Sequence, residues 1–169
     1  MQKIRQWATE LGFQQLGITG VDLGEHEAYL QKWLAAGYHG SMDYMARHGS
    51  KRARPQELVP GTLRVLSLRM DYLDRNTQEL EILASPEKAY ISRYTLGRDY
   101  HKTIKNKLKS LVSRIQKYSK IDGQNFFVDS APVLERAFAR DAGLGWIGKH
   151  TNLINKNHGS WFFLAEIFT

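Results

Sequence analysis

The clearest candidate for acid–base chemistry is a single carboxylate, Asp129, that follows the apolar run Phe126, Phe127 and Val128. The run predicts a buried strand that ends at this aspartate. Burial disfavours the charged form of a carboxylate and raises its pKa, which suits proton donation near neutral pH. The same spacing also suits Asp129 as the amino-terminal cap of a helix that opens at Pro132. Both interpretations stand on the sequence alone.

Residues 143–149 (GLGWIGK) match the pattern G-x-G-x-x-G. A dinucleotide-binding loop with this pattern follows a strand and opens a helix. Here the glycines follow a predicted helix and lead into a loop, so the context is reversed and we reject the dinucleotide interpretation. Glycines also let the backbone approach a bulky ligand closely, and Lys149 would place a cation beside it. The alternative is a helix stop followed by a turn.

Residues 92–101 (SRYTLGRDYH) gather two arginines, two tyrosines and a histidine around a glycine. They precede a predicted helix, whose amino terminus could bind an anion together with the arginines. Asp99 as the cap of that helix is the alternative. The histidines of the chain show no spacing typical of metal ligands, so no metal site is expected.

The predicted helix that follows is strongly basic, with no acidic residue between Tyr100 and Ile121. Its cations are Lys102, Lys105, Lys107, Lys109, Arg114, Lys117 and Lys120. Like charges at this density repel one another and weaken a helix. A phosphate backbone would offset that repulsion, whereas a solvated helix face is the alternative.

The composition is that of a water-soluble globular protein. The chain has 169 residues with a net charge of +7 and a pI near 9.6, a balance that favours an anionic partner such as nucleic acid. No apolar run is long enough to span a bilayer. There is no cysteine, so the chain can form no disulfide and no thiolate-ligated cluster. We expect a cytoplasmic protein that forms a single domain over residues 1–169 and makes no membrane contact.

Hydrophobic periodicity predicts an irregular alternation of helices and strands. The expected helices cover residues 1–11, 25–36, 99–118 and 132–142, and the expected strands cover 13–19, 63–70, 89–94, 125–128 and 161–168. Residues 73–88 are interpreted as a surface loop with room for a helical turn. This order predicts a mixed α+β fold, with a central sheet flanked by helices. Because the last apolar run reaches the final residue, we expect a chain truncated at its carboxyl end.

Five segments in series resemble the epoxyqueuosine reductase family. They are MDYM (42–45) with RARP (52–55), LVPG (58–61), SRY (92–94) with GRDYH (97–101), VDSAPVLER (128–136) and AGLGWIGKH (142–150). The resemblance runs through the whole chain in order. It implies the last step of queuosine synthesis, in which an epoxide on a modified tRNA anticodon base is reduced to an alkene with the help of cobalamin and two [4Fe–4S] clusters.

The resemblance also implies roles for individual residues. Asp129 matches the proton donor of the family. The positions expected to contact cobalamin are Arg52, Ser92, Asp129, Gly148, Lys149 and His150. The partner would be tRNA carrying epoxyqueuosine, bound by a monomer. The candidate tRNA contacts on the basic helix are Lys102, Lys105, Lys109 and Arg114.

The absence of cysteine departs from the family pattern. The family binds its clusters in a carboxyl-terminal ferredoxin-like module, which we expect this chain to lack, so that the chain alone would be inactive. A non-catalytic module that binds a corrinoid or tRNA is the alternative. An unrelated basic RNA-binding domain would need aromatic side chains on an exposed sheet, whereas the aromatics here have the pattern of a core.

Overall fold

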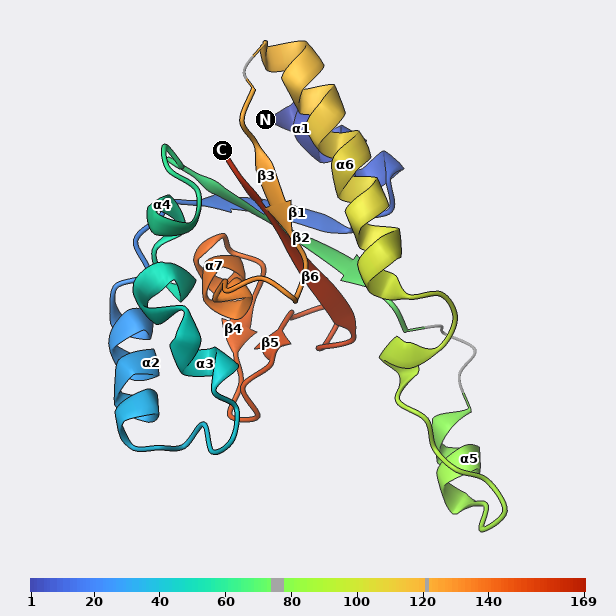
Figure 1. Cartoon of the computed structure of the whole chain (residues 1–169). Coiled ribbons are helices and arrows are strands. Elements are labelled where there is room, and N and C mark those ends of the chain that lie inside the picture. Colours follow the sequence, from blue (N-terminus) through green and yellow to red (C-terminus); the bar gives the residue numbers. More distant parts are fainter. Residues whose placement is uncertain (74–77, 121) are drawn as a thin grey trace.

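A four-stranded antiparallel sheet lies at the centre of the computed structural model, which describes residues 1–73, 78–120 and 122–169 (Figure 1). Its strands are β1 (Gln15–Thr19), β2 (Val65–Asp71), β3 (Asn125–Phe127) and β6 (Phe162–Phe168). Their order across the sheet is β1-β2-β6-β3. The last strand of the chain is therefore an inner strand, hydrogen-bonded on both sides.

Two helices, α1 (Gln2–Glu10) and α6 (Tyr100–Ser119), cover one face of the sheet (Figure 1). The apolar stripe of α6 is buried at Ile104, Leu108, Leu111, Val112 and Ile115. It packs against residues of alternate positions on the strands, namely Leu66, Leu68, Ala165 and Ile167. Asp99 caps α6, because its Oδ1 accepts a hydrogen bond from the backbone N–H of His101 at 2.9 Å.

The other face is covered by α7 (Glu135–Asp141), and α2 (Glu25–Ala35), α3 (Tyr44–Arg47) and α4 (Pro55–Leu58) group beside it (Figure 1). A 3₁₀ turn at Gly49–Arg52 joins α3 to α4. Phe138 of α7 is fully buried in a cluster with Val65 and Phe168. The sheet is thus the middle of three layers, and successive residues of each inner strand serve opposite helical layers.

A two-stranded hairpin, β4 (Trp146–Ile147) and β5 (Leu153–Ile154), follows α7. The glycines before it have structural roles. Gly143 has a φ of +79°, as a helix stop requires, and a Cβ on Gly145 would lie 2.1 Å from the carbonyl oxygen of Ile154. The interpretation of this pattern as a helix stop and turn is therefore confirmed.

The predicted α+β fold with a central sheet flanked by helices is confirmed, but the strand expected at 89–94 is wrong. Residues 89–92 have no regular structure, and Arg93–Thr95 form a 3₁₀ turn. Among the residues that the structure describes, no strand pairs with this segment, and Ile91 is exposed. The loop expected at 73–88 contains a short helix, α5 (Glu79–Ala84), that projects away from the sheet (Figure 1); its residues 74–77 lie outside the described part. Within the described residues, no helix is long and apolar enough to cross a membrane.

The close approach of β1 to the end of α7 can be tested at Gly17. A Cβ there would lie 2.1 Å from the carbonyl oxygen of Ala142 and 2.6 Å from Cδ1 of Leu144. We expect Gly17→Ala to destabilise the fold by roughly 1–3 kcal/mol, the usual cost of overpacking. At about 2–4 °C per kcal/mol, the loss is measurable by thermal denaturation followed by circular dichroism. The matched control is Gly20→Ala, because a Cβ on Gly20 meets no atom within 4 Å. Equal melting temperatures for the two variants would contradict the packing described.

Candidate active site

Asp129 lies in a tight turn between β3 and α7. Its φ is +52°, a left-handed conformation that costs most residues about 1–2 kcal/mol and that aspartate tolerates better than most. Its backbone N–H donates a hydrogen bond to Oε1 of Glu135 at 2.6 Å. The first residue of α7 therefore holds the turn in which the candidate acid lies.

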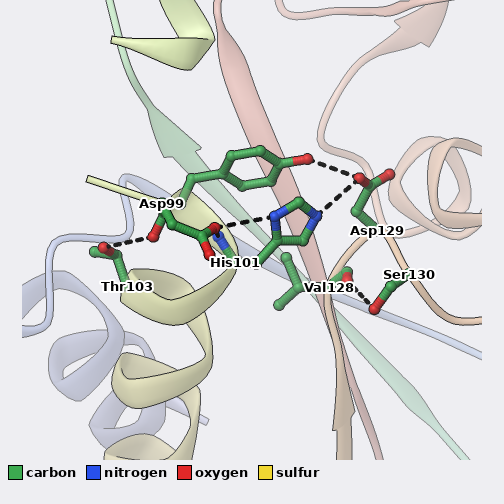
Figure 2. A network of polar contacts seen from close by, with 7 residues as sticks. Asp99, His101, Thr103, Val128, Asp129 and Ser130 are labelled. Atoms are coloured by element: carbon green, nitrogen blue, oxygen red, sulfur yellow. Dashed lines mark hydrogen bonds and ion pairs between the residues drawn. The ribbon is translucent and has the colours of Figure 1, made fainter. Parts of the chain in front are cut away.

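The carboxylate of Asp129 belongs to a hydrogen-bond network with the start of α6. The Tyr100 hydroxyl donates to Asp129 Oδ2 at 2.7 Å. His101 lies between two carboxylates, with its Nε2 3.1 Å from Asp129 Oδ2 and its Nδ1 3.1 Å from Asp99 Oδ1 (Figure 2). An imidazole in this position can take up a proton at one ring nitrogen and release a proton from the other nitrogen to the carboxylate beside it.

Ring stacking orients these two α6 side chains. The Tyr100 ring lies 4.2 Å from the ring of Phe163 at an interplanar angle of 7°, and 4.0 Å from the His101 ring on a tilt of 29°. Burial, followed by the hydrogen bond to Asp129, raises the pKa of Tyr100 above its usual value. The phenol therefore keeps its proton and acts as a hydrogen-bond donor to the carboxylate.

Two adjoining pockets, of about 400 and 480 Å³, meet at Asp129, Glu135 and Arg136. The smaller pocket has an aromatic wall of Tyr72, Tyr94, Tyr100, Phe162 and Phe163. The larger pocket is lined from the opposite side by His26, Leu30, Tyr44, Met45, Arg52, Ile147 and Thr151. The three shared residues therefore stand on the ridge between two cavities.

The expected burial of Asp129 is wrong, since its side chain is 60% exposed. The turn carries this side chain off the edge strand β3 and out into the pockets, away from the core that buries Val128. Capping by Asp129 is wrong as well, because α7 begins at Glu135 and no side chain caps it. Asp129 is thus an accessible carboxylate whose environment is set by hydrogen bonds.

Desolvation acts on two other carboxyl groups, Glu135 and Glu166. Burial raises the pKa of Glu135 to about 7, and the fully buried Glu166 has its pKa raised by burial and by Glu135 beside it. Sequence reasoning missed both residues. Glu166 carried a usable signal, because it is the only charged residue of the apolar run 161–168.

Arg52 and Ser92, two of the residues expected to contact the cofactor, lie in different environments. Arg52 lines the larger pocket, but it is only 9% exposed and its guanidinium donates to the carbonyl oxygens of Tyr44 and Met45, at 2.8 and 3.2 Å. It therefore braces the wall of the pocket. Ser92 lines neither of the two pockets that the described residues form around Asp129, and it begins the 3₁₀ turn Arg93–Thr95.

The remaining expected contacts, Gly148, Lys149 and His150, form the tip of the hairpin between β4 and β5. Gly148 is tightly enclosed, since an added Cβ would meet Ile154 Cδ1 at 2.6 Å. Lys149 and His150 are exposed. The residues on either side of this tip, Ile147 and Thr151, line the larger pocket, so the tip lies beside its rim.

The cationic side chains of the basic helix α6 lie in different environments. Lys102, Lys105 and Lys109 are exposed and lie on one side of the helix, next to the buried stripe. Arg114 instead forms an ion pair with Glu10 of α1 at 2.7 Å, and Lys107 donates to the carbonyl oxygen of Leu11. Together, Lys102, Lys105 and Lys109 form a lysine stripe. Across the described residues, no group of acidic or histidine side chains has the arrangement of a metal site.

Comparison with known proteins points to one family. A family model described as "Epoxyqueuosine reductase QueG, DUF1730" matches residues 52–130. The epoxyqueuosine reductase of Pseudomonas aeruginosa is 65% identical over 167 residues, which cover 99% of this chain and 46% of the relative. That of Escherichia coli is 57% identical, over 98% of this chain and 44% of the relative. The chain spans about half the length of the curated relatives it matches.

Solved structures agree on the fold. An epoxyqueuosine reductase from Streptococcus thermophilus superposes with a TM-score of 0.77 at 26% identity, over 99% of this chain and 45% of that one. A crystal structure of epoxyqueuosine reductase with an epoxyqueuosine-modified tRNA-Tyr stem loop gives a TM-score of 0.83 at 22% identity, over 99% and 44% of the two chains. The chain is therefore similar to the epoxyqueuosine reductases over about half of their length, and it matches their amino-terminal portion.

Proposed function

We propose that the chain forms the amino-terminal half of an enzyme that reduces epoxyqueuosine in tRNA to queuosine, and that Asp129 is its general acid. The observation that carries this proposal is an exposed carboxylate at the meeting point of two pockets, contacted by Tyr100 and His101, in a turn whose backbone N–H is held by Glu135. The 65% identity to a curated epoxyqueuosine reductase supports the choice of reaction.

The reaction requires an acid. Conversion of an epoxide to an alkene releases the oxygen as water, which consumes two electrons and two protons. Within the described chain, both the Tyr100 hydroxyl and His101 Nε2 approach the same oxygen of Asp129, Oδ2. Oδ1 is left to carry the proton towards the departing oxygen. A positioned acid of this kind contributes roughly 10²–10⁴-fold to a rate.

His101 gives Asp129 a route for the return of its proton. Its ring is partly exposed and is oriented by Asp99, which also caps α6. After Asp129 has donated, a protonated His101 can give its Nε2 proton to the carboxylate, and solvent can then restore the imidazole. The network thus supports repeated proton delivery by one residue.

The pockets accept part of a group as large as cobalamin, which would supply electrons to the substrate through its cobalt. The larger pocket is open and is walled by Tyr44, Met45, Ile147 and Thr151, with Arg52 bracing it from within. Gly148, Lys149 and His150 would approach the group from the rim. The chain contains no cysteine, so the thiolate ligands of any [4Fe–4S] cluster would come from outside these 169 residues.

The lysine stripe suits the backbone of the tRNA. Lys102 follows directly on Tyr100 and His101 of the site, and the stripe continues along the exposed side of α6. Phosphates bound along it would therefore lead to Asp129. A structural neighbour solved with an epoxyqueuosine-modified stem loop supports RNA as the partner.

The acid role predicts a specific effect of Asp129→Asn in a chimera that joins this chain to the remaining half of the Pseudomonas aeruginosa relative. Asparagine tolerates a left-handed φ and keeps the shape, but it cannot donate an acidic proton. Turnover, measured by mass spectrometry of digested tRNA, should fall by roughly 10²–10⁴-fold, while the melting temperature stays near that of the unsubstituted chimera. The control is Asp122→Asn, an exposed aspartate outside both pockets. A rate near that of the unsubstituted chimera for Asp129→Asn would remove the assignment.

The tRNA surface can be tested by charge reversal of the lysine stripe in the same chimera. Replacing Lys102, Lys105 and Lys109 with glutamate should raise the Kd for the stem loop by about tenfold or more and flatten its dependence on salt, because fewer counterions are released. Fluorescence anisotropy at several salt concentrations measures both. The matched control reverses Lys32, Lys88 and Lys156, exposed lysines away from α6. If the two triple variants lose affinity equally, net charge rather than the stripe governs binding.

A further inference from the structure

The turn that carries Asp129 depends on one hydrogen-bond acceptor from α7. Glu135 Oε1 accepts the Asp129 backbone N–H at 2.6 Å, while Glu135 itself lines both pockets. Asp129 is left-handed at this point, and such a conformation persists in a non-glycine residue only when its surroundings hold it. Glu135 is therefore placed to decide whether the carboxylate of Asp129 stays between the two pockets.

A second carboxyl group, that of Glu166, lies beside the carboxyl group of Glu135. It is an inner-strand residue of β6, 0% exposed, opposite Ser67 of β2 and Phe127 of β3. The polar groups beside its carboxyl are Glu135 and Ser67, and within the described residues neither carboxyl oxygen has a hydrogen-bond partner of good geometry. An ionised carboxylate cannot remain buried without donors, so Glu166 is neutral and its own proton is available to Glu135.

We propose that Glu135 is a positioning residue that fixes the Asp129 turn while it is ionised, that neutral Glu166 stabilises its charge from behind, and that protonation of Glu135 releases the turn. The inference rests on the proposed role of Asp129 as the acid. Its physical basis is that a hydrogen bond to a charged acceptor is roughly twice as strong as one to a neutral acceptor.

The charged and titratable groups around Glu135 set the pH of this change. They come from every neighbouring element: Asp129 from the turn, Arg136 from α7, Tyr100 from α6 and Glu166 from β6. Burial and the charge of Asp129 raise the pKa of Glu135 to about 7, whereas the hydrogen bond from the Asp129 backbone N–H, the nearby Glu166 carboxyl and the charge of Arg136 act in the opposite direction. The turn should therefore be held above pH 7 and loosened below it.

The test is an NMR titration of the 169-residue chain labelled with ¹⁵N. The amide proton of Asp129 should move downfield as pH rises, with a midpoint near the Glu135 pKa of about 7. His101 is an ionisable side chain directly beside Asp129, so the titration is repeated in His101→Gln. The transition should persist there and vanish in Glu135→Gln, which still accepts the hydrogen bond but cannot ionise. A transition that survives in Glu135→Gln, or no transition near neutral pH in the unsubstituted chain, would overturn the proposal.

The role of Glu166 is separated by two substitutions. Glu166→Gln retains a donor and should leave the midpoint of the Asp129 transition nearly unchanged. Glu166→Leu removes the donor that stabilises ionised Glu135, so the midpoint should rise. The control is Glu10→Gln, at a surface ion pair on the far side of α6. An unchanged midpoint in Glu166→Leu, with a folded spectrum, would remove Glu166 from the inference.

Thermal stability gives a second measurement with a defined sign. The pKa of both buried acids is higher in the folded chain than the usual value, so above about pH 4.5 the folded state binds more protons than the unfolded state. These two groups therefore contribute a loss of stability as pH rises towards 7 and beyond. The melting temperature should decline between pH 5 and 8, and the decline should be shallower in Glu166→Gln. Equal declines would show that Glu166 is not a buried neutral acid. Neither measurement uses turnover, so failure here and failure of Asp129 as the acid are distinguishable.

Discussion

The antiparallel pairing of β6 with both β2 and β3 is the interaction on which the rest of the structure depends. It extends along β2 from Val65↔Phe168 to Asp71↔Phe162 and along β3 from Asn125↔Phe168 to Phe127↔Glu166. Because side chains alternate across a sheet, this single strand sends Ala165 and Ile167 to the α6 layer and Glu166 and Phe168 to the α7 layer. A one-residue slip would exchange the two sets and expose the core.

The candidate site follows from the same pairing. β3 is an edge strand of the described sheet and pairs with β6. The chain can therefore turn out of the sheet directly after Val128 and place Asp129 in an accessible position. Elements on opposite faces of the sheet then meet at this residue: Tyr100 and His101 of α6 contact its carboxylate, and Glu135 of α7 accepts its backbone N–H. The site is assembled at the β3 edge of the sheet, where residues of both helical layers contact Asp129.

The carboxyl groups around the site have different environments: that of Asp129 is exposed, whereas those of Glu135 and Glu166 are partly or fully buried. Asp129 is exposed and hydrogen-bonded, so it can exchange protons with substrate and solvent. Glu135 and Glu166 are shielded, so burial acts on their pKa values. An acid that must reach a large ligand cannot also be deeply buried. Glu135 contacts Asp129 through the backbone N–H of the turn and leaves the carboxylate of Asp129 accessible.

The sequence alone determined the secondary structure wherever periodicity was long and regular. The stripe of α6, the apolar strand at the end of the chain and the Asp99 cap were predicted from local spacing and are present. The strand expected at 89–94 failed, because a short alternation of apolar residues becomes a strand only if a neighbouring strand accepts its hydrogen bonds.

Asp129 could be chosen from the sequence as the site residue, whereas its environment could not be derived. Local spacing suggested burial or helix capping, yet its partners Tyr100, His101 and Glu135 come from two other elements. Arg52 and Ser92 were likewise expected to contact the same ligand. In the tertiary structure Arg52 stabilises a pocket wall, whereas Ser92 begins an exposed turn. Spacing along a chain specifies which face of an element a side chain occupies. The burial and the partners of that side chain depend on which elements pack against that face, and only the tertiary structure decides this.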